Sequence, residues 1–134
     1  MTEVEKKIEA EVNNVGYVCV IPEDGVIRFD LVNLDENGNV PLEALQKRVG
    51  GWVELIYSGA YVSQEMVDRN IDIFINEEGK LNALAYNPRA TALTRLLLWG
   101  DSIVGPAVLC KSDNEDNSVP LSEDDKEFLC RIVG

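Results

Sequence analysis

Histidine is absent from this 134-residue chain. Its absence removes the commonest general base, the usual partner of a serine or cysteine nucleophile, and the commonest ligand of transition metals. Long apolar runs are also missing: a membrane-spanning helix needs roughly 20 apolar residues, and the longest candidate, residues 92–99, is interrupted by Thr94 and Arg95. The N-terminus is charged and lacks the apolar centre of a secretory signal. We therefore expect a cytoplasmic protein with no membrane partner.

Cysteine is scarce, and the few cysteines lie far apart in the sequence. Cys19, Cys110 and Cys130 are an odd number of thiols, far apart in sequence, each flanked by apolar residues. A disulfide scaffold needs paired cysteines in a loop-rich secreted chain, and a zinc site needs short CxxC-type spacing. The pattern predicts three buried, reduced, structural thiols.

Positive charge is outnumbered two to one, by 24 Asp and Glu against 12 Lys and Arg, which gives a net charge of −12. Nucleic acid is repelled by such a molecule, so direct nucleic-acid binding is not expected. Two interpretations of the acidity stay open. It is either a solvated surface without a partner or an imitation of a nucleic-acid backbone toward a basic target.

The hydrophobic content of 46% predicts a folded chain with one core, so we expect residues 1–134 to form a single compact domain. Strands are expected at residues 17–21, 26–32, 52–57, 71–75 and 103–110, and helices at residues 3–12, 41–49, 87–98 and from residue 122 onward. This mixture predicts the α+β class, with a mixed, mostly antiparallel sheet and three or four short helices. We expect residues 1–14 to form the N-terminal helix, residues 17–110 the sheet-containing core, and residues 111–134 an acidic loop and the C-terminal helix. Residues 58–70 interrupt a hairpin as an insertion.

One acidic loop resembles the first half of a calcium-binding EF-hand loop. Asn33, Asp35 and Asn37 place oxygen ligands at positions one, three and five, and Gly38 follows at position six. Position twelve, where a bidentate Glu should complete the site, is Ala44. We therefore interpret the loop as a solvated turn and expect no metal and no cofactor.

The start of the helix expected at residues 87–98 is the main candidate site. Asn87 suits the N-cap position, where it has a structural role. Arg89 would face the positive end of the helix dipole, a mismatch of up to ~1 kcal/mol. Backbone N–H groups, Arg89, the Thr91 hydroxyl and Arg95 could together hold a phosphate or carboxylate. The alternative is that Arg89 forms an ion pair with a carboxylate, for which the candidates are Glu54, Asp72 and Glu78.

Three aromatic residues accompany these cations. Trp52, Tyr86 and Trp99 are typical core or interface residues. If they line the same cleft, an aromatic wall beside an anion site would suit a nucleotide-like ligand.

Four short motifs occur in a fixed order: Val49-Gly50-Gly51-Trp52-Val53-Glu54, residues 75–81, residues 87–91 and residues 100–105. Together they resemble a small domain family of unknown function, found in phages, plasmids and bacterial genomes, with VGG-aromatic-x-E, NEEGK, NPxAT and GDxIVG motifs. The resemblance covers residues 42–110. The N-terminal helix, the insertion at residues 58–70 and the acidic C-terminal extension lie outside the family pattern. The setting implies an accessory role, in the cytoplasm of the host cell if a phage encodes the protein.

These features favour binding over catalysis. The first hypothesis is a counter-defence protein that sequesters a small anionic, nucleotide-like ligand at Asn87, Arg89 and Thr91. The alternative is an acidic inhibitor or nucleic-acid mimic that binds a host protein. A third hypothesis is a metal-dependent enzyme that cleaves a phosphodiester. A homo-oligomer is compatible with all three.

Overall fold

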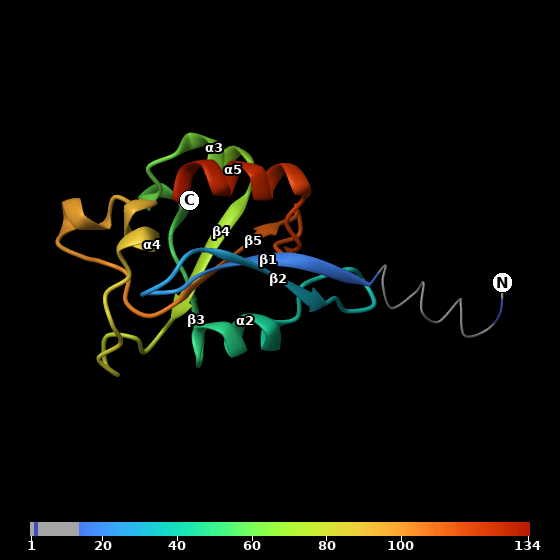
Figure 1. The fold of residues 1–134 in the computed structure, drawn as a ribbon, viewed down its shortest axis with the longest axis horizontal. Coiled ribbons are helices and arrows are strands. Elements are labelled where there is room, and N and C mark those ends of the chain that lie inside the picture. Colours follow the sequence, from blue (N-terminus) through green and yellow to red (C-terminus); the bar gives the residue numbers. More distant parts are fainter. Residues whose placement is uncertain (1, 3–13) are drawn as a thin grey trace.

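A six-stranded antiparallel sheet forms the centre of the molecule (Figure 1). The structure, a computed structural model, describes residue 2 and residues 14–134. The strands are β1 (Val15–Ile21), β2 (Arg28–Asn33), β3 (Val53–Leu55), β4 (Ile71–Asn76), β5 (Ala107–Ser112) and β6 (Ser118–Val119). Their order is β2-β1-β5-β4-β3, with β6 paired to β5. All of these pairs are antiparallel, which confirms the predicted α+β class.

Helices cover both faces of this sheet. They are α2 (Leu42–Val49), α3 (Gln64–Asp68), α4 (Pro88–Ala92) and α5 (Glu123–Val133), with 3-10 turns η1 (Ser58–Ala60) and η2 (Leu96–Trp99). Figure 1 shows α2 on one face and α3 and α5 on the other. The helix expected at residues 3–12 lies outside the described residues.

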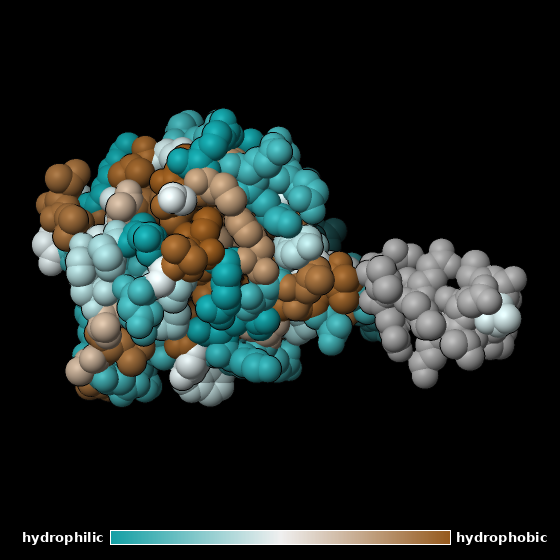
Figure 2. All heavy atoms as spheres, viewed as in Figure 1, coloured by the Kyte–Doolittle hydropathy of each residue, from teal (hydrophilic) through white to brown (hydrophobic). Residues whose placement is uncertain are grey.

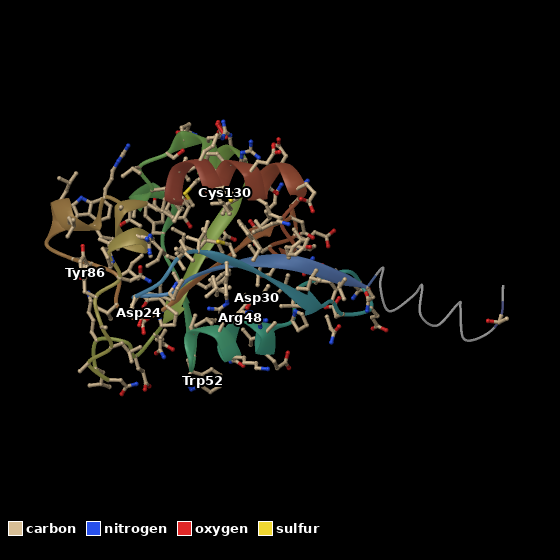
Figure 3. All side chains as sticks on the ribbon, in the orientation of Figure 1. Asp24, Asp30, Arg48, Trp52, Tyr86 and Cys130 are labelled. Carbon is tan, nitrogen blue, oxygen red and sulfur yellow. The ribbon has the colours of Figure 1, made fainter. Side chains whose placement is uncertain are left out.

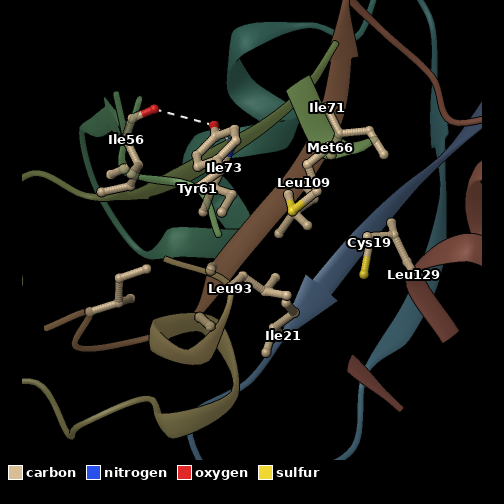
Figure 4. Close-up of a cluster of buried hydrophobic side chains, with 14 of the residues drawn as sticks. Cys19, Ile21, Ile56, Tyr61, Met66, Ile71, Ile73, Leu93, Leu109 and Leu129 are labelled. Carbon is tan, nitrogen blue, oxygen red and sulfur yellow. Dashed lines mark hydrogen bonds between the residues drawn. The ribbon is translucent and has the colours of Figure 1, made fainter. Parts of the chain in front are cut away.

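Successive side chains along the central strands point to opposite faces of the sheet, and a hydrophobic core forms on each face. In β1, Cys19 and Ile21 pack with residues of α3, α4 and α5 (Figure 4), whereas Val18 and Val20 pack with α2. All four side chains are at most 1% exposed. Burial on both faces explains why β1 is a nearly continuous apolar run, a pattern more typical of parallel sheets.

Both predicted hairpins are present. β1 pairs with β2 across the turn that contains Gly25. β3 pairs with β4 although residues 58–70 intervene, and this insertion folds into η1 and α3. The insertion is therefore an ordered part of the fold that packs against the rest of the core.

The helix predicted at residues 87–98 is wrong beyond Ala92. α4 has five residues, and the chain then makes an isolated bridge between Thr94 and Tyr61 before entering η2. The insertion takes the backbone groups that a longer helix would use: the amide of Val62 donates to the Leu93 carbonyl (3.1 Å), and that of Arg95 donates to the Ala60 carbonyl (2.5 Å). Tertiary hydrogen bonds thus override the helix propensity of this segment.

The C-terminal helix begins as predicted. The Ser122 hydroxyl accepts from the amide of Asp125 (3.1 Å), and the Asp125 carboxylate accepts from the amide of Ser122 (2.8 Å). This reciprocal capping box satisfies two donors at the start of α5. It also places the Asp125 carboxylate, 2% exposed, against Arg69 of the insertion and Lys111 of β5.

Candidate ligand-binding site

The side chain of Asn87 links three segments of the chain inside the protein. Its amide nitrogen donates to the carbonyls of Ile21 and Gly105 (2.9 Å each), and its side-chain oxygen accepts from the amide of Ala90 (3.0 Å). The residue is fully buried. The side chain thus ties the end of β1, the turn before β5 and the start of α4 together, and it faces away from solvent.

Thr91 has the same kind of role. Its hydroxyl donates to the carbonyl of Asn87 (2.7 Å) and accepts from the amide of Ile103 (2.9 Å), and the residue is fully buried. The structure therefore brings Asn87 and Thr91 together, but on the inside of the molecule. Sequence reasoning identified their cap and spacing without showing which way they face.

Residues of the other motifs also lie where separate segments of the chain meet. The side chain of Asn76 donates to the Val49 carbonyl (3.0 Å) and accepts from the Glu78 amide (2.8 Å), so it links the end of α2 to the turn after β4. Gly105 has a φ of +76°, and an added Cβ would lie 2.7 Å from Leu84 Cδ1. A side chain there would be strained both by the backbone and by the contact. These motif positions are explained by the fold, and a ligand site must be sought beside them.

Arg89 is exposed and donates a hydrogen bond to the carbonyl of Gly25 in the β1–β2 turn. None of its predicted carboxylate partners is bonded to it. The dipole argument for an anion at this position is weakened, because α4 is a single short turn and the macrodipole grows from many aligned peptides. The Arg89 side chain thus connects α4 to the β1–β2 turn.

Arg95 lies in a different environment. It is exposed and lines a hollow of about 320 Å³ whose wall is built from residues 57–59, 61–64 and 67. Ser58, Ser63 and Tyr57 contribute hydroxyl groups, and the lining has no carboxylate. The backbone bonds between residues 60–62 and 93–95 hold this cation beside the insertion. Arg95 was predicted from its charge, whereas the serines were missed because the insertion gives no periodic signal.

The predicted aromatic wall is not assembled at this hollow. Trp52, Tyr86 and Trp99 are 65%, 50% and 60% exposed, and none of them lines it. Figure 3 shows Trp52 beyond the start of β3 and Tyr86 near α4, on separate parts of the surface. The rings that do line the hollow are Tyr57, which is 75% exposed, and Tyr61, which is buried.

Tyr61 is held in place by two hydrogen bonds. Its hydroxyl donates to the Ile56 carbonyl (3.2 Å; Figure 4) and accepts from the Ile73 amide (3.1 Å). Burial raises the pKa of this hydroxyl to about 12. The hydroxyl therefore stays neutral, and its two hydrogen bonds fix the ring in the lining of the hollow.

The cysteines are partly as predicted. Burial raises the pKa of both Cys19 and Cys110 to about 12, so these thiols are inert. The expectation that all three are buried is wrong for Cys130, which is exposed on α5. Cys130 lines a wider hollow of about 720 Å³, in which the carboxylates of Glu123, Asp124 and Glu127 outnumber the cations of Lys126 and Arg131, a balance that does not favour an anion.

The loop that resembles an EF-hand closes on itself. The Asp35 carboxylate accepts from the amides of Asn37 and Asn39 (2.9 Å each). This is an Asx-type turn, in which backbone donors occupy the oxygen that a cation would need. Within residues 14–134 no group of three or more Cys, Asp or Glu side chains is arranged to hold a metal ion.

The fold and these hollows define a compact α+β protein with an antiparallel sheet covered on both faces, a basic side-chain hollow on the insertion, and an acidic exterior. None of its described helices is long and apolar enough to cross a membrane. The chain belongs to the DUF3846 family, a domain of unknown function, whose model matches residues 17–132. The match extends well beyond the expected residues 42–110 and includes the insertion and α5. No curated protein and no solved structure matches the chain.

Proposed function

We propose that this protein binds a small anionic, nucleotide-like ligand, with Arg95 as the anchor for its negative charge. The observation that carries the proposal is the Arg95 hollow, which an exposed arginine lines together with Ser58 and Ser63, with no carboxylate in the lining. The site predicted from sequence is thereby moved from Asn87 and Thr91, which face the interior, to the neighbouring insertion.

The charge environment supports this choice. In the described part of the chain, four arginines form ion pairs with carboxylates: Arg28, Arg48, Arg69 and Arg131. Arg89 donates to a backbone carbonyl, and the guanidinium of Arg95 has no hydrogen-bond or ion-pair partner from residues 14–134. On a protein with twice as many acids as bases, an unpaired guanidinium is a specific attraction for an anion.

The size and lining of the hollow fit a phosphorylated aromatic molecule. A volume of about 320 Å³ falls at the lower end of the range for small-molecule sites, roughly 300–1,000 Å³. Hydroxyl donors from Ser58 and Ser63 would complement Arg95 at a phosphate, and the exposed ring of Tyr57 offers a stacking surface for a base. The absence of histidine supports capture rather than turnover.

The resemblance to domains carried by phages and plasmids extends the proposal to a biological role. A protein that captures a nucleotide-derived signal without consuming it would act as a counter-defence sponge in the host cytoplasm. Such a role requires tight stoichiometric binding and no catalytic residue.

The test is isothermal titration calorimetry with mononucleotides, cyclic nucleotides and inorganic phosphate as probes. Arg95→Ala should weaken binding at least tenfold, because a hydrogen bond to a charged group contributes about 1.5–3 kcal/mol. Arg89→Ala is the matched control and should bind as the natural chain does. If no probe binds, or if Arg95→Ala binds as tightly as the natural chain with its melting temperature unchanged, the proposal is wrong.

A second function, inhibition of a host protein through an acidic surface, is favoured by a separate observation. Exposed carboxylates gather in the loop before β6, at Glu115 and Asp116, and in the first turn of α5, at Glu123 and Asp124. Binding of this kind should weaken steeply with added salt and survive Arg95→Ala.

A further inference from the structure

Gly59 lines the Arg95 hollow, where it lies against the ring of Tyr57. A Cβ added to Gly59 would overlap Cε1 of that ring and lie 2.9 Å from its Cζ and 3.1 Å from its Cδ1. The φ of Gly59 is outside the positive range that favours glycine, so alanine fits its backbone. The ring of Tyr57 therefore occupies the space that a side chain at position 59 would need, and this contact is the reason for glycine there.

The backbone around this contact is anchored in the core. The amide of Ala60 donates to the carbonyl of Tyr57 (2.9 Å), and Ala60 is buried. The next residue, Tyr61, is fixed by the two hydrogen bonds of its buried hydroxyl. Gly59 thus has a fixed place in η1, whereas the Tyr57 side chain is 75% exposed. A side chain added at position 59 should therefore move the exposed ring and leave the backbone in place.

The hollow has a single positive charge. Arg95 is the only cation among the described residues that line it, and no carboxylate offsets this charge. The residues that follow Arg95, Leu96–Trp99 of η2, are all apolar. Figure 1 shows η2 at the end of the molecule opposite the start of β1, and Figure 2 shows an apolar protrusion at that end. One guanidinium matches one phosphate group, and a second phosphate would find no cation in the lining.

We propose that Gly59 is a positioning residue that sets the Tyr57 ring for stacking, and that the hollow takes a nucleoside monophosphate. This inference rests on the proposed function, because it requires that Arg95 binds an anion. Arg95 would bind the single phosphate, and the exposed ring of Tyr57 would stack on the base. Every base has a flat π-face, so the ring selects for the presence of a base and only weakly for its identity.

Isothermal titration calorimetry with adenosine 5′-monophosphate and ribose 5-phosphate tests the role of the ring. The two probes share the sugar and the phosphate, and only the first has a base. The natural chain should bind the nucleotide about tenfold more tightly than the sugar phosphate. Tyr57→Ala should remove this difference by weakening the nucleotide alone, and Tyr57→Phe should keep it. Adenosine 5′-diphosphate should bind no more tightly than the monophosphate, because the lining offers its second phosphate no cation.

Gly59→Ala tests the positioning role. Nucleotide affinity should fall about as far as in Tyr57→Ala, the affinity for ribose 5-phosphate should not change, and the melting temperature should not fall, because alanine fits this backbone. The double variant should lose no more affinity than Tyr57→Ala, since Gly59 acts only through the ring. Gly25→Ala is the matched control. Gly25 also has a φ outside the positive range but lies in the β1–β2 turn, so its replacement should leave both affinities unchanged.

Equal affinity of the natural chain for adenosine 5′-monophosphate and ribose 5-phosphate would overturn the inference and leave anion binding at Arg95 intact. An unchanged nucleotide affinity in Tyr57→Ala or Gly59→Ala would also overturn it, as would a loss in the double variant equal to the sum of the two single losses. Tighter binding of the diphosphate would overturn the assignment of a monophosphate. Absence of binding by every probe would overturn the proposed function as well, so the two failures give different results.

Discussion

Replacement of Asn87 by alanine removes a side chain that makes three hydrogen bonds in the interior. The carbonyls of Ile21 and Gly105 and the amide of Ala90 belong to buried residues, and all three lose this partner. Each unsatisfied buried group costs about 1–3 kcal/mol. Partial entry of water offsets some of this loss, so we expect the free energy of unfolding to fall by about 3–5 kcal/mol. A domain of this size has about 5–15 kcal/mol in total, so Asn87→Ala should be only marginally folded.

The assay is equilibrium unfolding in urea, followed by far-ultraviolet circular dichroism and tryptophan fluorescence. Asn87→Asp is a useful second variant because it keeps the shape and the acceptor but loses both donors, and it places a buried charge against two carbonyls. It should be at least as unstable as the alanine variant. Asn82→Ala, in an exposed loop, should stay within about 0.5 kcal/mol of the natural chain.

If Asn87→Ala lowers the free energy of unfolding by less than about 1 kcal/mol, Asn87 does not link these three segments in the way proposed. The contrast with Arg95 is the decisive part of the experiment. Asn87→Ala should lose stability but bind ligand when folded at low temperature, and Arg95→Ala should show the opposite result. If both residues affect binding and neither affects stability, the site lies at the start of α4 after all.

Three further variants test the energetics. Asp125→Asn should cost about 2–4 kcal/mol at neutral pH, because it leaves Arg69 without a buried partner. Burial opposes the charge of Asp125, but hydrogen bonds from Ser122, Arg69 and Lys111 outweigh it and hold its pKa below the usual value. Its stabilisation is therefore present above about pH 4 and lost as the pH falls, so thermal melts of this variant and the natural chain should converge in acid. Burial raises the pKa of Asp72 in the native state. The native state therefore loses stability as the pH rises from the ordinary carboxylate pKa through the raised one, and Asp72→Asn should have a higher melting temperature than the natural chain at pH 7. Asp116→Gly should gain about 0.5–1 kcal/mol in urea unfolding, because Asp116 has a φ of +62°.

Much of the fold could be predicted because its signals are local. Alternating β-branched runs around a glycine turn predicted the β1–β2 hairpin, and the spacing of Ser122 and Asp125 predicted the capping box that begins α5. The helix at residues 87–98 was wrong for the opposite reason. Its composition favours helix, but its end is decided by hydrogen bonds to Ala60 and Val62, which lie about 30 residues earlier in the sequence.

The candidate site shows the same division. Arg95 could be proposed from its charge and spacing alone. Its serine neighbours could not, since they become neighbours only through the backbone bonds that join the insertion to the segment after α4. Asn87 and Thr91 were given a ligand role because a cap residue and a hydroxyl have the same sequence signature whether they face solvent or the core.

The motif residues and the proposed site therefore have different physical roles. Motif residues such as Asn76, Asn87 and Gly105 stand where distant segments converge, and any side chain that misfits there costs stability. The Arg95 hollow is lined largely by residues 57–67, which the family model also covers. If anion binding resides in that hollow, substitution of Arg95 should weaken binding and leave the fold unchanged. Substitutions at Asn76, Asn87 or Gly105 should instead lower stability, and the folded fraction of each variant should bind the ligand as the natural chain does.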